Sequence, residues 1–461
     1  MNDAYIAVDF GGGSGRVIAG TIIGGRLTLD EVYRFQNRRV TLGNTVYWDF
    51  PALYADMIEG LRLAARKYRL HSVAIDTWGV DFGLIDVHGN LVSNPVCYRD
   101  PAVAGVAEEY FSKHSAQEHY AVAGIQVMDI NTMFRLIEFR RSRPELLSVA
   151  KHLLFMPDLF SYYLTGEINC EYCIASTSEL LDARKRNWNY PLIESLGLDP
   201  SMFPPIVMPG TVRGSILPRV REEIGVDYDV KVIAAGSHDT ASAVYTAMTD
   251  VPDPSATAYL SSGTWSLLGV LTDNPVLTEE ARTAGFTNEG GVGGKIRLLQ
   301  NITGLWILQE LMAGWKATGE GMSYPELVGQ SRESSCATVI DVDDPVFATS
   351  TDMQQTIVDY CCVNGLDVPA TKGDFGRCVM LSLADRYRRG IEALNAILPS
   401  PVKYLRIIGG GSRNELLNEL TGAATHLPII AGPAEATAIG NILLQAAVDG
   451  IDTAGVDIDS D

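Results

Sequence analysis

Short apolar runs that end on polar residues are the dominant pattern along this chain. Residues 231–235 are rich in valine, isoleucine and alanine, which is typical of a strand buried on both faces of a sheet. His238, Asp239 and Thr240 come directly afterwards, before a run of small residues compatible with a helix. Because open α/β sheets bind ligands beyond the carboxyl ends of their strands, we expect this trio at a binding site. Taken alone, Asp239 or Thr240 could equally be an ordinary cap of the following helix.

The beginning of the chain predicts three consecutive strands joined by glycine turns, over residues 5–10, 16–23 and 26–35. No helical pattern follows the first turn, and the G-x-G-x-x-G spacing is absent, which argues against a dinucleotide-binding fingerprint. A helical pattern starting at Pro51 leads to a second buried strand over residues 72–76. Residues 256–271 again read as strand, Gly/Ser turn and strand. This repetition favours an internal duplication over coincidence.

The remaining segments alternate helical patterns with glycine loops. Residues 98–225 are mostly helical in pattern, with helices expected over residues 130–141 and 153–164. A further helix is expected over residues 374–397.

Two glycine loops near the end of the chain each precede a helical pattern. A strand over residues 404–408 runs into a loop over residues 409–414, and a second loop covers residues 431–440. A glycine loop between a strand and a helix N-terminus can bind an anion through its backbone N–H groups. We therefore expect both loops to take part in nucleotide binding.

Composition narrows the class of protein. A chain of 461 residues is too long for one ordinary core, so two domains are expected. The formal net charge of −20 argues against a nucleic-acid partner, which would need a basic surface.

The sequence also bears on the location of the protein. No run of 18 apolar residues occurs, and Asp3 and Asp9 interrupt any signal peptide, so no membrane partner and a cytoplasmic location are expected. Seven cysteines, an odd number, suit a reducing compartment, and the pair Cys170 and Cys173 supplies only half of a structural zinc site. The oligomeric state is not readable from the sequence.

Together these motifs resemble the FGGY family of carbohydrate kinases over nearly the whole chain. Residues 7–16 resemble the first phosphate hairpin of the family, residues 259–265 the second, and residues 409–414 and 432–440 the nucleotide-side loops. Other motifs resemble the members that act on L-rhamnulose, at residues 75–82, 98–100, 156–158, 236–243, 287–291 and 301–306.

The resemblance implies an α/β fold of two ribonuclease-H-like domains, of the actin and hexokinase type, with an interdomain cleft. The N-terminal domain, over residues 1–245, would bind the sugar and carry the first phosphate hairpin and the catalytic aspartate. The C-terminal domain, over residues 246–461, would bind the nucleotide.

The resemblance also implies roles for individual residues. Asp239 would accept the proton of the sugar hydroxyl, and Asp9 would hold Mg²⁺ through water, with Asp81 a weaker candidate for sugar contact. The residues expected to touch the sugar are Gly79, His238, Asp239, Thr240 and Asn301. The residues expected to bind ATP are Gly12, Gly13, Ser14, Gly15, Arg16, Thr264, Gln309 and Gly410. Since Gly12 and Gly13 stand where related members often have Ala and Ser, any role of Gly13 must be a backbone one.

The implied reaction is the ATP-dependent phosphorylation of L-rhamnulose at its primary 1-hydroxyl, in L-rhamnose catabolism. Another ketose such as L-fuculose or D-xylulose stays open, because hydroxyl orientation is read by pocket geometry. An ATP- and sugar-binding module without turnover would be expected to have lost the carboxylate, yet Asp239 is present. A metal-dependent phosphohydrolase built on His238 and Asp239 would need further ligands, and the seven histidines are scattered.

Overall fold

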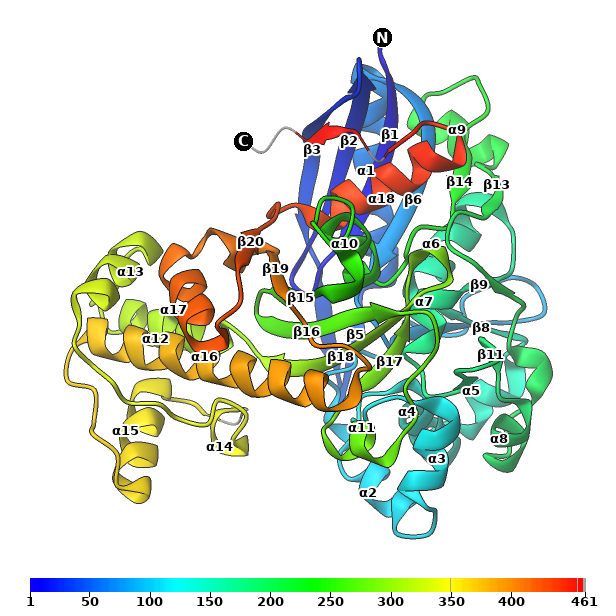
Figure 1. Ribbon diagram of the computed structural model, residues 1–461. Coiled ribbons are helices and arrows are strands. Elements are labelled where there is room, and N and C mark those ends of the chain that lie inside the picture. The colour runs from blue at the N-terminus through cyan, green and yellow to red at the C-terminus, as the bar shows by residue number, and fades with distance from the viewer. Residues whose placement is uncertain (349, 454, 459–461) are drawn as a thin grey trace. The chain divides into compact units, whose positions relative to one another are not determined.

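The computed structural model describes residues 1–348, 350–453 and 455–458, which form two compact units (Figure 1). The first unit comprises Met1–Thr246, Thr272–Leu298 and Thr437–Asp461. The second unit comprises Ala247–Leu271 and Leu299–Ala436. Within the described ranges, none of the helices combines the length and the apolar character needed to cross a membrane.

A seven-stranded sheet forms the centre of the first unit, in the order β13-β14-β6-β1-β2-β3-β21. Its strands are β1 (Asp3–Phe10), β2 (Ser14–Ile23), β3 (Arg26–Gln36), β6 (Arg69–Thr77), β13 (Val212–Ser215), β14 (Lys231–Ile233) and β21 (Asp457–Ile458). The five strands expected from the sequence in this unit are confirmed. Strands β1, β6 and β14 are mutually parallel, so their carboxyl ends lie at the same edge of the sheet.

Helices and short strands surround this sheet. The first helix, α1 (Phe50–Lys67), is capped by Asp49, has Pro51 in its first turn and buries Leu53, Met57 and Leu61. The other helices of the unit are α2 (Val106–Phe111), α3 (Ala116–Ala123), α4 (Thr132–Ser142), α5 (Pro144–Val149), α6 (Met156–Thr165), α7 (Tyr172–Ser176), α8 (Tyr190–Ser195), α9 (Pro218–Ile224), α10 (Asp239–Ala247), α11 (Glu279–Thr283) and α18 (Ala436–Val448). The short strands are β4 (Arg39–Leu42), β5 (Thr45–Trp48), β7 (Phe82–Ile85), β8 (His152–Phe155), β9 (Cys170–Glu171), β10 (Leu181–Asp182), β11 (Asn187–Trp188), β12 (Ile206–Val207) and β17 (Thr287–Gly290).

Two expected boundaries are wrong. The helix expected over residues 153–164 begins only at Met156, because the preceding residues form β8 against β7 and Pro157 favours an extended residue before the helix. The loop expected over residues 431–440 is shorter, since α18 begins at Ala436 and contains Gly440.

The last long helix, α18, packs on the sheet of the first unit, where Figure 1 shows it beside the strands of the N-terminus. Its residues Ile439, Ile442 and Leu443 are buried in one cluster with Ala7 and Ile18 of β1 and β2. The contacts thus group some residues beyond 245 with the N-terminal residues. The expected division at residue 245 into a sugar-binding and a nucleotide-binding domain stays a prediction. Residues 437–461 and 272–298 group with the N-terminal residues, because a helix with this apolar face is buried on the first sheet.

The second unit contains five strands of a six-stranded sheet whose order is β17-β18-β16-β15-β19-β20. Its strands are β15 (Thr257–Ser262), β16 (Trp265–Thr272), β18 (Ile296–Thr303), β19 (Tyr404–Ile408) and β20 (Ile429–Ala431). Its helices are α12 (Trp306–Ala317), α13 (Tyr324–Glu333), α14 (Pro345–Ala348), α15 (Met353–Asn364), α16 (Lys372–Ile397) and α17 (Glu415–Thr425). As in the first unit, an antiparallel hairpin (β15–β16) pairs its first strand in parallel with a later strand, β19. The repetition expected from the sequence is thus present in the strand pairing.

Candidate active site

The trio His238, Asp239 and Thr240 lies at the carboxyl edge of the first sheet. Thr77 at the end of β6 forms a β-bridge with His238 and donates its backbone N–H to the carbonyl of Ser237 at 2.9 Å. Helix α10 begins at Asp239, whose Oδ1 accepts from the backbone N–H of Thr240 at 2.6 Å and from its hydroxyl at 3.1 Å. The Asp239 side chain is 29% exposed, so a substrate can reach its carboxylate.

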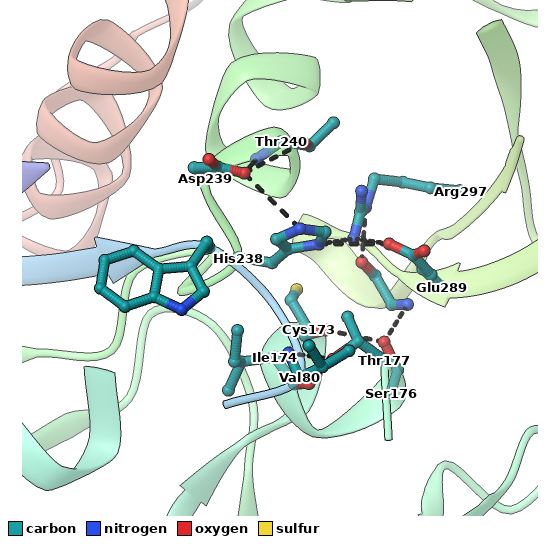
Figure 2. Close-up of polar contacts among 12 residues, drawn as sticks. Val80, Cys173, Ile174, Ser176, Thr177, His238, Asp239, Thr240, Glu289 and Arg297 are labelled. Carbon is teal, nitrogen blue, oxygen red and sulfur yellow. Dashed lines mark hydrogen bonds and ion pairs between the residues drawn. The ribbon is translucent and has the colours of Figure 1, made fainter. Parts of the chain in front are cut away.

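Figure 2 shows His238 beside Asp239 and Thr240, two of the other expected sugar residues. The Nε2 atom of His238 lies 3.5 Å from Asp239 Oδ1. A Cβ atom added to Gly79 would lie 3.4 Å from that same Nε2. Any larger side chain at position 79 would therefore occupy the space in front of the imidazole. The structure thus places Gly79, His238, Asp239 and Thr240 side by side.

Two buried aspartates stand next to each other on neighbouring strands. Asp9 of β1 is the register partner of Asp76 of β6, and both are almost completely buried. Burial raises the pKa of Asp9, although its 2.5 Å ion pair with Arg16 opposes the rise. Burial, and next the Asp9 carboxylate, raise the pKa of Asp76 well above its usual value, and the charge of Asp239 acts on both aspartates in the same direction. The three carboxylates thus form one electrostatically coupled group.

Helix α18 orients Asp76 through its amide side chains. Asn441 donates to Asp76 Oδ2 at 2.5 Å, and Gln445 donates to Asn441 Oδ1 at 2.7 Å. Gln445 also donates to the carbonyl of Ile6 and accepts from the hydroxyl of Ser72. The carboxylate of Asp76 is consequently held from the helix that covers the sheet.

Asp81 has a structural role in this arrangement. Its Oδ2 accepts from the indole N–H groups of Trp48 and Trp78, at 2.5 and 2.7 Å, and its Oδ1 forms a buried ion pair with Arg135. Arg135 also donates to the carbonyl of Val80. These bonds fix the turn that carries Gly79, so Asp81 supports the site and is fully used within the protein.

The turn between β1 and β2 is open to solvent at Gly12 and Gly13. Gly12 and Gly13 are exposed, and a Cβ atom on either would meet nothing within 4 Å. Asn37 supports this turn by donating its side-chain amide to the carbonyl of Gly11 at 2.5 Å. Gly15 is tightly packed instead, because a Cβ there would lie 2.3 Å from the Phe35 ring.

The second unit holds the other expected nucleotide residues. The hydroxyl of Thr264, in the β15–β16 turn, donates to Oε1 of Gln309 at 3.2 Å. Gly410 begins a 3₁₀ turn, Gly410–Arg413, after β19. This turn approaches β15 closely, since a Cβ on Gly411 would lie 2.0 Å from the Ser262 hydroxyl. Asn301 lies on β18 in the same unit.

Comparison with known proteins matches both halves of the chain to one family. The N-terminal domain of the FGGY family of carbohydrate kinases matches residues 4–245, and its C-terminal domain matches residues 258–448. The chain belongs to the FGGY family of carbohydrate kinases. Rhamnulokinase of Bacteroides thetaiotaomicron is 45% identical, covering 99% of this chain and 93% of that protein. Rhamnulokinase of Oceanobacillus iheyensis is 38% identical, covering 98% and 95%.

The fold of this FGGY kinase is also that of solved sugar kinases. Gluconate kinase from Lactobacillus acidophilus superposes with a TM-score of 0.82 at 14% identity, covering 99% of this chain and 92% of that one. The expected two-domain α/β fold of the actin and hexokinase type is thereby confirmed. The chain is an ATP-dependent sugar kinase of the FGGY family.

Sequence reasoning did not identify several residues of the site. Asp76 ends the strand expected over residues 72–76 and lies in the motif at residues 75–82, but no role was assigned to it. Asn441 and Gln445 carried no signal, since no local pattern shows which sheet a distant helix will cover. Glu289, which contacts His238, was visible only as part of the motif at residues 287–291, without a role. Arg297, which also contacts His238, lay outside every motif.

Proposed function

We propose that this FGGY kinase transfers the γ-phosphoryl group of ATP to the 1-hydroxyl of L-rhamnulose, giving L-rhamnulose 1-phosphate, with Asp239 as the proton acceptor. The observation that carries the proposal is the accessible Asp239 carboxylate beside His238 and Gly79, at the edge where β1, β6 and β14 end. The extent of identity to two rhamnulokinases supports L-rhamnulose over other ketoses. Consumption of ATP also fits the cytoplasmic location expected from the sequence.

Asp239 is suited to accept the proton of the attacking hydroxyl. Both bonds from Thr240 go to Oδ1, so we assign Oδ2 to the sugar hydroxyl. General base catalysis of this kind contributes about 10²- to 10⁴-fold to a rate. We assign His238, Thr240, Gly79 and Asn301 to binding and orienting the sugar.

The rest of phosphoryl transfer is positioning and charge neutralisation. We assign the β1–β2 turn and the start of β2, Gly12 to Arg16, to the phosphates. Gly12 and Gly13 are exposed, and the backbone N–H groups of such a turn can bind an anion. Thr264, Gln309 and Gly410 are assigned to the remainder of ATP. The hydrogen bond between Thr264 and Gln309 supports a common role for these two side chains.

The carboxylates near the β1–β2 turn fit Mg²⁺, which is bound in proteins by one or two carboxylates together with water and substrate phosphates. Asp76 Oδ1 is buried and has no hydrogen-bond partner among the described residues, and Asp9 is its register partner. We assign Asp9 to the ion, held through water. When bound, Mg²⁺ would neutralise negative charge on the phosphates.

The proposal is tested by ADP release with ATP, Mg²⁺ and a panel of L-rhamnulose, L-fuculose, D-xylulose and L-ribulose. We expect the highest kcat/KM for L-rhamnulose, and a phosphate on C1 of the product by ³¹P NMR. A higher kcat/KM for another ketose would reassign the substrate. Absence of ADP release with every ketose would instead favour a binding module without turnover.

A further inference from the structure

A buried ion pair lies behind His238, on the side away from Asp239 (Figure 2). Arg297 of β18 is 0% exposed, and its Nη2 lies 2.9 Å from Oε2 of Glu289 on β17. Arg297 also donates from Nε to the carbonyl of Gly290 at 2.8 Å. Although burial raises the pKa of Glu289, Arg297 and His238 together lower it to about 2. Glu289 is therefore ionised at neutral pH and compensates the buried guanidinium.

The same guanidinium reaches the imidazole. Arg297 Nη2 lies 3.0 Å from Nδ1 of His238. A guanidinium stays protonated in proteins and has no acceptor atom, so in this contact Nδ1 must accept. A neutral imidazole that accepts at Nδ1 carries its proton on Nε2.

The competing arrangement is less favourable. Glu289 Oε2 also lies 3.1 Å from Nδ1, and a proton on Nδ1 could be donated to it. That proton would then face an Arg297 N–H donor across the 3.0 Å contact. With the proton on Nε2 this conflict disappears, and Glu289 still accepts from Arg297.

We infer that Arg297, anchored by Glu289, is a positioning residue that holds His238 with its proton on Nε2, so that a hydrogen-bond donor faces the sugar beside Asp239. The inference rests on the proposed function, in which His238 contacts the sugar. It deepens that function, because the sugar group at this point must then be an acceptor, such as a carbonyl oxygen or the lone pair of a hydroxyl. A ketose presenting no acceptor oxygen there would be bound more weakly.

The tautomer can be measured without any substrate. The wild-type protein labelled with ¹⁵N-histidine is compared with His238→Gln, which assigns the His238 resonances in ¹⁵N-edited NMR spectra. We expect a pyridine-type shift for Nδ1 and a pyrrole-type shift for Nε2. The reverse pattern, or an imidazolium at neutral pH, would overturn the inference even if the protein is an active rhamnulose kinase.

The contribution of the contact between Arg297 and His238 to ketose binding is measured with the double variant Glu289→Leu/Arg297→Met. Removing both charges together avoids leaving one of them buried and unpaired. Since one hydrogen bond contributes about 1 kcal/mol, we expect the KM for L-rhamnulose to rise roughly 5- to 10-fold, with the KM for ATP changed less than about twofold. The NMR spectrum of the variant should show both tautomers of His238.

A third variant separates positioning from general packing. The amide N–H₂ of glutamine donates without needing a particular tautomer, so in a His238→Gln background the double replacement should change the ketose KM less than about twofold. An undiminished effect in that background would overturn the inference.

The control Glu138→Leu/Arg143→Met removes another partly buried ion pair, at the end of α4, and should leave the ketose KM unchanged. An equal rise in the control would assign the effect to loosened packing. Wild-type protein without ketose turnover would refute the proposed function, while the tautomer measurement would still decide the inference.

Discussion

Asp239 resembles a helix cap in its local bonds but differs from one in its surroundings. It begins α10 and accepts from Thr240, as a capping carboxylate would. However, its charge acts on two buried aspartates, Asp9 and Asp76, and raises the pKa of both. A carboxylate needed only as a cap would gain nothing from neighbouring negative charges. The surroundings therefore favour a chemical role for Asp239.

Replacing Asp239 with asparagine separates these roles. Asparagine keeps an oxygen that can accept from Thr240 but cannot take up the hydroxyl proton. We expect kcat to fall by about 10²-fold or more, with the KM for ATP within a few fold of wild type. The matched control is Asp199→Asn, because Asp199 also accepts from a following backbone N–H and hydroxyl, those of Ser201. Unchanged turnover in Asp239→Asn would remove Asp239 from the mechanism.

At the residue scale, the sequence predicted the groups that follow strands and missed those that arrive from elsewhere. His238, Asp239 and Thr240 were expected at a binding site because open α/β sheets bind ligands beyond the carboxyl ends of their strands, whereas Gly79 was expected only from the family resemblance. Glu289 could not be assigned, since its role depends on a contact with a side chain 51 positions away, in a separate segment of the chain.

At the scale of elements, α10 and α18 approach each other so closely that one glycine is required. A Cβ atom on Gly440 of α18 would lie 1.9 Å from the backbone oxygen of Ser242 in α10. The sequence pattern predicted a loop over residues 431–440, which includes Gly440. The close approach explains why a helix tolerates it here.

Gly440→Ala should therefore be destabilising although alanine favours helices. We expect a loss of about 1–3 kcal/mol in the free energy of unfolding, since the helices must separate to admit the methyl group. A lower kcat should accompany it, because α10 begins with Asp239. In the control Gly314→Ala, within α12, the new Cβ would meet nothing within 4 Å, and we expect a gain of about 0.5–1 kcal/mol. Urea unfolding of the two variants measures the contrast, and equal effects would contradict it.

Helix α7 predicts a pH dependence of stability. Its capping residue Glu171 accepts from the N–H groups of Cys173, Ile174 and Ser237. Burial nevertheless raises the pKa of Glu171 to about 7. Between its ordinary pKa and about 7 the folded protein holds a proton that the unfolded chain has lost. Protonated Glu171 therefore contributes its full stabilisation of the folded protein below the ordinary glutamate pKa. As the pH rises through 7 this contribution is lost, and the free energy of unfolding falls by about 3 kcal/mol.

Glu171→Gln tests this dependence because glutamine does not titrate. We expect the urea midpoint of the variant to rise relative to wild type as the pH increases from 5 to 8. Other buried carboxyls, such as Asp76 and Asp158, also have raised pKa values, so part of the wild-type pH dependence should remain. In the control, Glu326→Gln on α13, the difference should not vary over this range, because hydrogen bonds from Ser323 lower the pKa of Glu326. A constant difference for Glu171→Gln would refute the assignment.

At the scale of the whole molecule, the local pattern predicted the strands well but could not predict which sheet the last helix covers. The alternation of polar and apolar residues, and short runs of apolar residues, indicate which faces of a strand are buried. The two hairpins and the strand over residues 404–408 were therefore correctly predicted. Which sheet a helix covers depends on contacts between residues hundreds of positions apart. Helix α18 follows the last strand of the second unit, β20, in sequence, yet it lies on the sheet that begins the chain.

The division of the chain can be tested with Ile442→Ala in α18. Ile442 is 0% exposed and packs against Gly20 of β2, so we expect a loss of about 2–5 kcal/mol. If α18 is part of the first unit, native-state hydrogen exchange should show reduced protection in β1 and β2 and unchanged protection in β19 and α16. Leu416→Ala in α17 is the matched control and should produce the opposite distribution. A division at residue 245 instead predicts that Ile442→Ala weakens the same amides as Leu416→Ala, and this outcome would return α18 to the second unit.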